Sequence, residues 1–164
     1  MKFRLIIVVV IGAILFSCTK KHDSSPAPVY NQSFKWTYGS TDYVADSSTV
    51  YINGRFNKRT ILAWNKGNVV GSFKIGFLVT SFDLGAYQFT PTTTGSNPSP
   101  PSATTNNLYY YDDNGNELRV INGAVNILSK TNERMSGNFT ANLLDGNGVN
   151  KYLVGSFTDV PIKP

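Results

Sequence analysis

The chain has little of what most enzymes and nucleic-acid-binding proteins use. Its 164 residues contain one cysteine, Cys18, and one histidine, His22. A single cysteine excludes an internal disulfide, and a single histidine removes the commonest general base and metal ligand from most of the sequence. Charged residues make up only 15% of the chain, and its cations are scattered instead of forming a basic track for phosphates. We therefore predict no nucleic-acid partner.

Catalytic motifs are missing as well. The sequence contains no nucleophile elbow, phosphate-binding loop or dinucleotide-binding glycine pattern. A carboxylate-pair hydrolase needs only two Asp or Glu side chains in one cleft, but most carboxylates here stand beside Gly or Asn in predicted turns. The prediction is a non-enzyme with no catalytic residue and no cofactor, and a carboxylate-based hydrolase is kept as an alternative.

Residues 1–17 predict a signal peptide. Two cations precede the apolar run 5–16, which is too short to span a bilayer as a helix because a span needs about 20 residues. The tetrad 15–18 (Leu-Phe-Ser-Cys) resembles the lipobox of bacterial lipoproteins. We expect Cys18 to carry a diacylglycerol and a further acyl chain such as palmitate, since several chains anchor stably where one is marginal. An ordinary secretory signal is the alternative.

The rest of the chain divides into a tether and one domain. Residues 18–32 are polar and rich in proline, which is typical of a flexible tether, and His22 lies within it. Residues 33–164 have the length of one domain. The predicted location is the bacterial cell envelope, lipid-anchored in the outer membrane, with the periplasmic or surface orientation left open.

Alternation of apolar and polar residues predicts β-strands from Ser33 onward. Two segments, 72–80 and 135–144, show this alternation most clearly. In the first, the predicted core residues are Phe73, Ile75, Phe77 and Val79, while Lys74 and Gly76 are expected to face water. In the second, the predicted core residues are Met135, Phe139, Ala141 and Leu143.

Residues that tolerate positive φ separate the β-rich runs. Asn53-Gly54, Asn114-Gly115, Asn122-Gly123 and the tetrad 145–148 suit tight hairpin turns. No window carries helical periodicity for more than two turns. Short strands with glycine-rich turns predict an all-β fold, an antiparallel β-sandwich, with a closed soluble β-barrel as the alternative. The uncharged segment 91–107 is predicted to be a long mobile surface loop.

The order of short motifs resembles a known group of proteins. Behind the lipobox come Phe34-Lys35-Trp36, Gly85-Ala86-Tyr87, a tyrosine run at 109–111, the segment 136–140 (Ser-Gly-Asn-Phe-Thr) and a closing 155–162. This order is similar to that of the small all-β lipoproteins of unknown function that are abundant in the Bacteroidetes. The resemblance implies an envelope-anchored β domain with no known activity. In that group an acidic run soon after the cysteine favours surface export, but here Asp23 follows two lysines.

Two sets of residues are candidates for binding. Trp36, Tyr38, Trp64 and Tyr110 exceed what one strand face can bury, and alternation turns Tyr110 away from its two neighbours. We favour cross-strand core packing for these aromatic side chains. The alternative is ligand binding, because exposed Trp and Tyr stack on sugar rings or anchor protein partners. We favour a plain hairpin turn at 112–117, with a weak calcium site at Asp112, Asn114 and Asn116 as the alternative, because these residues have the oxygen density of such a site. No other metal site is predicted.

These observations predict an envelope-anchored lipoprotein that is a non-catalytic binding or accessory module. Its candidate partners are the membrane, through lipidated Cys18, and a glycan, a lipophilic ligand or another envelope protein. A structural subunit of an envelope assembly is the alternative function.

Overall fold

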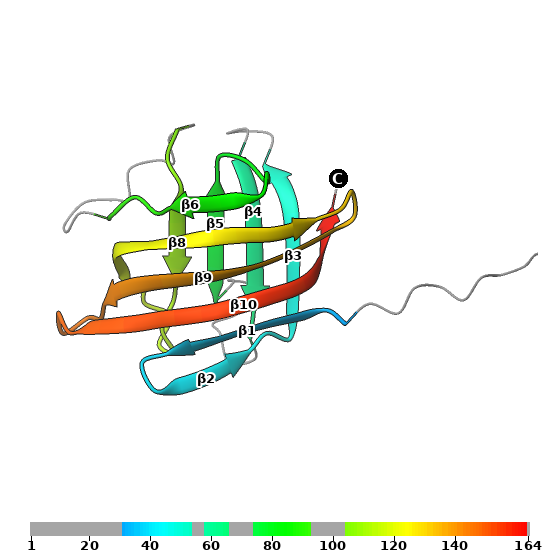
Figure 1. The fold of residues 1–164 in the computed structure, drawn as a ribbon. Coiled ribbons are helices and arrows are strands. Elements are labelled where there is room, and N and C mark those ends of the chain that lie inside the picture. Colours follow the sequence, from blue (N-terminus) through cyan, green and yellow to red (C-terminus); the bar gives the residue numbers. More distant parts are fainter. Residues whose placement is uncertain (1–30, 54–57, 66–73, 93–103, 164) are drawn as a thin grey trace, which may run out of the picture.

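Ten β-strands and no helix make up the part of the chain that the computed structural model describes, which is residues 31–53, 58–65, 74–92 and 104–163 (Figure 1). The all-β prediction is therefore confirmed. Cys18 and most of the predicted tether lie outside the described residues. Within the described part, no helix is long and apolar enough to cross a bilayer. The strands are β1 (Ser33–Tyr38), β2 (Thr41–Val44), β3 (Ser47–Asn53), β4 (Lys58–Trp64), β5 (Ile75–Val79), β6 (Gly85–Gln88), β7 (Asn107–Tyr110), β8 (Arg119–Lys130), β9 (Arg134–Leu144) and β10 (Asn150–Lys163).

The strands form two layers that cross at a steep angle (Figure 1). Sheet A has the order β6-β8-β9-β10-β1-β2, and sheet B has the order β3-β4-β5-β7. Strand β10 belongs to both layers, because its last residues, Ile162 and Lys163, pair in parallel with β3. Every other ladder between named strands is antiparallel. The two layers are therefore one continuous sheet that curls back over itself.

The two ends of this curled sheet, β6 and β7, meet at Asn106. An isolated bridge pairs Asn106 with Phe89, and the Thr90 amide donates to the Asn106 carbonyl at 2.8 Å. The Asn106 side chain also donates to the Gln88 carbonyl at 3.1 Å and accepts from the Thr80 amide at 2.9 Å. The structure therefore has the two layers of the predicted sandwich, and a single curled sheet forms both of them.

Phenylalanine rings fill the space between the layers. Phe34 of β1 stacks on Phe157 of β10 and on Phe77 of β5, with ring centroids 5.6 and 6.3 Å apart. Phe77 in turn packs against Phe139 at 4.8 Å and Phe89 at 5.7 Å. All five rings are buried, and truncating one such ring to alanine typically costs about 3–5 kcal/mol. The predicted inward face of β9 is confirmed, because alternate residues from Met135 to Leu143 are buried.

Strand β8 corrects one predicted turn. Asn122 and Gly123 lie inside β8, so the predicted hairpin there is wrong. The register shifts between Val120 and Asn122, and Gly123 has a φ of 145°. A Cβ at Gly123 would collide with the Thr140 carbonyl oxygen and would lie 2.6 Å from the Cα atom of Ala141 on β9. The glycine is therefore needed for a β-bulge and for the close approach of the β9 backbone, and it does not form a turn.

The other predicted turns have mixed outcomes. The turns at Asn114-Gly115 and at 145–148 are confirmed, with positive φ at Gly115 and Gly148. Gly54 and Phe73 lie outside the described residues. Residues 93–103 of the predicted loop 91–107 also lie outside them, whereas Asn106 and Asn107 at its end belong to the sheet.

Candidate functional site

The four aromatic candidates do not form one exposed platform. Trp36 and Tyr110 are buried in the core, with exposed fractions of 2% and 0%, while Tyr38 and Trp64 are half-buried. Tyr110 lies opposite Ile75 in the inward row of sheet B, so its side chain packs in the core and is not available to a ligand on the surface. The side chains alternate as predicted, with Tyr110 on the inward face and its neighbours Tyr109 and Tyr111 on the opposite face. Core packing therefore explains Trp36 and Tyr110.

Lys74 is buried although the alternation predicts a water-facing side chain. Its exposed fraction is 1%. Strand β5 begins only at Ile75, and Lys74 stands at a bend just before it. Backbone hydrogen bonds to Ala63 and Tyr111 hold that bend in the ladder. The bend directs the ammonium group to the end of the sandwich, where it lies 5.3 Å from the Tyr43 ring centroid and 5.7 Å from that of Tyr110.

Asp113 joins three separate elements at this end of the molecule. Lys74 Nζ donates to Asp113 Oδ1 at 2.6 Å, and the Tyr43 hydroxyl donates to Asp113 Oδ2 at 3.0 Å. Behind them, Trp36 Nε1 donates to the Tyr110 hydroxyl at 3.3 Å, and the Trp36 ring stacks on Tyr43 at 5.4 Å. The Asp113 side chain itself is 72% exposed. We refer to these five residues as the Lys74 cluster.

The electrostatics of the Lys74 cluster favour an ionised Asp113 and neutral Tyr43 and Tyr110 near neutral pH. The hydrogen bond from Lys74 is the main reason that the pKa of Asp113 lies below its usual value, and the Tyr43 hydroxyl lowers it further. Burial, together with the hydrogen bond to Asp113, raises the pKa of Tyr43 to about 12. Burial also raises the pKa of Tyr110. A paired cation and two neutral phenols suit a structural clamp.

The predicted calcium residues form a compact turn. Asp112 Oδ1 accepts from the backbone amides of Asn114 and Asn116 at 2.9 and 2.8 Å, and Oδ2 accepts from the Asn116 side chain at 3.1 Å. Burial acts to raise the pKa of Asp112, but the hydrogen bonds from Asn116 and Asn114 lower it on balance. Within the described residues no three His, Cys, Asp or Glu side chains are grouped to hold a metal. These contacts are those of an Asx-type hairpin turn.

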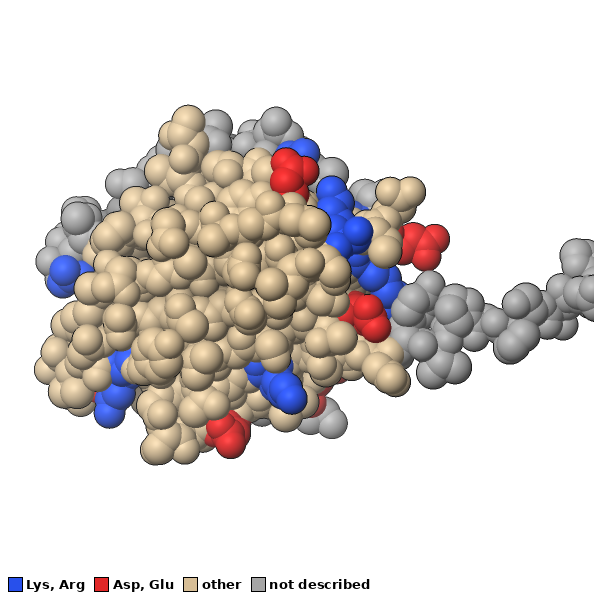
Figure 2. Space-filling view, in the orientation of Figure 1, with Lys and Arg blue, Asp and Glu red and all other residues tan. Residues whose placement is uncertain are grey.

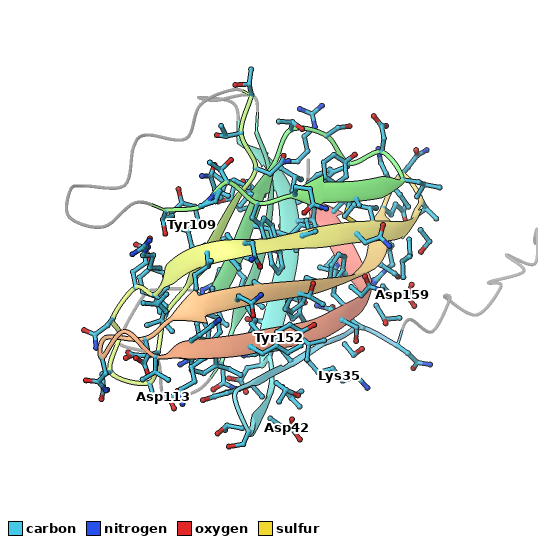
Figure 3. The ribbon with its side chains drawn as sticks, turned by 60° about the vertical axis from the view of Figure 1, so that its left-hand side comes forward. Lys35, Asp42, Tyr109, Asp113, Tyr152 and Asp159 are labelled. Carbon is cyan, nitrogen blue, oxygen red and sulfur yellow. The ribbon has the colours of Figure 1, made fainter. Side chains whose placement is uncertain are left out.

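A groove of about 500 Å³ lies on the outer face of sheet A, across β2, β1 and β10. Two exposed apolar side chains, Val44 on β2 and Val154 on β10, face it from either side, with exposed fractions of 64% and 38%. Figure 3 shows Lys35 and Asp42 beside this region, below Tyr152 on β10. The residues that line the groove are Lys35, Trp36, Thr37, Asp42, Tyr43, Val44, Val154, Gly155 and Ser156.

The strand register fixes the side chains of the groove. One row across the strands holds Val44, Lys35 and Ser156, and the next holds Asp42, Thr37 and Val154. The Thr37 hydroxyl donates to Asp42 Oδ1 at 2.6 Å. The groove thus combines apolar walls with a few polar groups, which is the usual composition of a small-ligand site.

The groove and the Lys74 cluster occupy opposite faces of the same two strands. Trp36 and Tyr43 point inward from β1 and β2, so their stacked rings and the hydrogen bond to Asp113 hold the short edge strand β2 in place. A site held by packed residues beneath it is preorganised for binding. Sequence reasoning missed this site, because Val44 and Val154 differ from solvated strand residues only in being apolar at outward positions.

Replacing Asp113 tests the clamp. The lowered pKa of Asp113 stabilises the folded state above its unfolded pKa of about 3.9, and this contribution is lost as the pH falls through the lower folded pKa. We expect Asp113→Asn to unfold at lower denaturant concentration at pH 7 and to lose less stability than the wild type between pH 4 and pH 2. Denaturant unfolding at each pH is the measurement, and Glu133→Gln, at the far end of sheet A, is the control. Identical pH profiles for Asp113→Asn and the wild type would contradict the clamp.

No protein-family model matches the chain, and neither a curated protein nor a solved structure is significantly similar to it. Functional conclusions therefore depend on the chemistry of the groove and of the strands around it.

Proposed function

We propose that the chain is a lipid-anchored, non-catalytic binding module of the bacterial cell envelope, and that its ligand binds in the groove across β2, β1 and β10. The groove carries this proposal, because it is hollow, has apolar walls and stands on strands that are fixed from behind. The lipobox at Cys18 supports the anchor, and the outer membrane is the proposed location.

The anchor and the groove are compatible in space. Strand β1 begins at Ser33, directly after the predicted tether 18–32. The β1–β2 hairpin and the Lys74 cluster lie at the other end of β1. In Figure 1 strand β1 begins at the same end of sheet A as the β8–β9 turn, while the β1–β2 hairpin lies at the opposite end. A tether attached at the start of β1 would therefore leave the β1–β2 end of the groove open to a ligand.

A lipophilic ligand held between the sheets and a hydrolase both fit the structure less well than a ligand in the groove. A lipophilic ligand between the sheets would have to displace the phenylalanine stack around Phe34 and Phe77. A hydrolase with two carboxylates would need a second acid in the groove, where Asp42 is the one carboxylate among the lining residues. A structural subunit of an envelope assembly would use the same outer face. The experiments below therefore distinguish this alternative function from the binding module.

The anchor is tested at Cys18. We expect the wild-type chain, expressed in a diderm bacterium grown with labelled palmitate, to incorporate the label and to sediment with membranes, because lipid attachment requires the cysteine thiol. Cys18→Ser should abolish the label and release the chain into the soluble envelope fraction. Ser17→Ala, which keeps a small residue before the cysteine, is the control and should leave the label intact. Labelling of Cys18→Ser would contradict the anchor.

The groove is tested with a thermal-shift screen of the chain from residue 19 against calcium, oligosaccharides and lipophilic compounds. A ligand at a hundred times its Kd adds about 2.7 kcal/mol of stability. We expect a saturable increase in melting temperature that Val154→Asp abolishes, because a carboxylate would then stand in an apolar wall.

Val149→Asp is the matched control, since Val149 is also an exposed valine but lies in the β9–β10 turn. It should leave the ligand-dependent shift unchanged. A shift that survives Val154→Asp would place the ligand outside the groove. No shift with any compound, together with a specific protein crosslinked to the groove in intact cells, would favour the structural subunit.

A further inference from the structure

We propose that the ligand of the groove is a neutral, hydroxyl-rich polysaccharide chain, which continues from the groove over the outer face of β10, β9 and β8. This inference rests on the proposed function and names the ligand class for the same surface. The surface consists of three rows of outward side chains across sheet A, which we call the amide face. The rows are Ala86, Asn126, Asn138, Ser156, Lys35 and Val44; Gln88, Ala124, Thr140, Val154, Thr37 and Asp42; and Asn122, Asn142 and Tyr152.

The amide face is almost uncharged. Lys35 and Asp42 are the charged members of its three rows, and both lie at the β1–β2 margin. Other charged residues of sheet A, such as Lys130 and Arg134, lie at strand ends. Figure 2 shows the result as a broad front face without charged side chains over β8, β9 and β10, with charges gathered at its margins. An anionic chain would find no counter-charge in the middle of this surface, whereas a neutral chain needs none.

Side-chain amides and hydroxyls replace charge on this face. Asn126 lies directly opposite Asn138, and Asn138 lies opposite Ser156 on the next strand. Asn142 Nδ2 donates to Asn122 Oδ1 at 2.8 Å, which fixes the orientation of that pair. An amide offers both donors and acceptors, as a hydroxyl does. Rows of such groups therefore match a ligand whose own surface carries hydroxyls in both roles.

One aromatic ring stands among the amides. Tyr152 of β10 is 51% exposed and lies opposite Asn142. The residue beside it on the β1 side is Gly39, whose amide donates to the Tyr152 carbonyl at 2.9 Å and which has no side chain to cover the ring. Figure 3 shows Tyr152 on the same side of the sheet as Lys35. Such a ring has an apolar body and a polar tip, and so suits the C–H face and the hydroxyl edge of a sugar.

The uncharged rows, their amide and hydroxyl groups, and the Tyr152 ring lie on one surface that is continuous with the groove. Val154 belongs both to the groove wall and to the middle row of the amide face. Neighbouring strands are about 4.8 Å apart, which is close to the length of one pyranose ring. A sugar chain that crosses the strands therefore meets a new set of outward side chains at each residue. A protein partner would more typically be met by several aromatic, Met and Arg anchors, and Tyr152 is the one aromatic residue in the three rows.

The test is binding of the purified full-length lipoprotein, in detergent micelles, to immobilised oligosaccharides. The neutral probes are linear hexasaccharides of glucose, mannose, xylose and N-acetylglucosamine, and the acidic probes are hexagalacturonate and a heparin hexasaccharide. We expect saturable binding to at least one neutral probe and none to the acidic probes. Asn138→Asp should weaken binding by about tenfold or more, because it places an unpaired charge between Asn126 and Ser156 in the first row of the amide face.

Matched variants separate binding from folding. Asn132→Asp makes the same chemical change in the exposed β8–β9 turn and should leave the affinity unchanged. Tyr152→Ala should weaken binding, whereas Leu84→Ala, which truncates a 65% exposed side chain outside the amide face, should not. Equal melting temperatures for the four variants would exclude unfolding as the cause.

Each contrary outcome has a distinct meaning. Binding to an acidic probe or a lipophilic compound that Val154→Asp abolishes would overturn the neutral polysaccharide but keep the groove as the binding site. Binding to no neutral probe, or neutral binding indifferent to Asn138→Asp and Tyr152→Ala, would overturn the inference on the amide face. A protein crosslinked at Tyr152 in intact cells, with no glycan binding, would assign the face to an envelope protein.

Discussion

The whole architecture depends on β10, the strand that is shared by the two layers. It pairs with β9 and β1 in sheet A and then, beyond an irregularity between Phe157 and Val160, with β3 in sheet B. Asp159, with a φ of 50°, lies at that irregularity. Its amide donates to Ser136 Oγ at 3.0 Å, and its carbonyl accepts from Arg134 at 2.5 Å. Without this bend the strand could not turn from one layer into the other.

Strand β10 also contributes Gly155 to the lining of the groove. Gly155 of β10 lies opposite Trp36 of β1, and a Cβ there would collide with the Phe139 ring and the Lys35 carbonyl and come within 2.7 Å of the Trp36 Cβ. The glycine lets the tryptophan, the phenylalanine stack and the groove strands pack closely. The inner face of β1 and β2 therefore serves stability, and the outer face is the one on which we propose that a ligand binds.

Much of this fold follows from local sequence. The inward residues of β9, from Met135 to Leu143, alternate strictly, and the turns at 114–115 and 145–148 carry residues that tolerate positive φ. These features need only the period of a strand and the chemistry of a turn. The signal at Cys18 is equally local, although it remains a prediction.

The incorrect predictions concern tertiary context. Lys74 has an outward position in the alternation, but a bend before β5 and a carboxylate from a distant turn make it a buried residue. Asn122-Gly123 has turn chemistry, but β9 continues past it, so the glycine forms a bulge inside β8. Tyr110 follows the alternation, but which side is inward is set by the partner strand. The groove arises from pairing between residues more than a hundred positions apart, which no local pattern reveals.

The central claim is that the ligand binds on the outer face of sheet A, and nuclear magnetic resonance mapping tests it most directly. Backbone amide shifts of the chain from residue 19 would be recorded while a ligand identified by thermal shift is added. The account predicts saturable changes that centre on Val44, Lys35 and Val154 and extend toward Tyr152 and Asn142. Changes confined to the turn around Asp113, or to sheet B, with the groove strands unaffected, would contradict it.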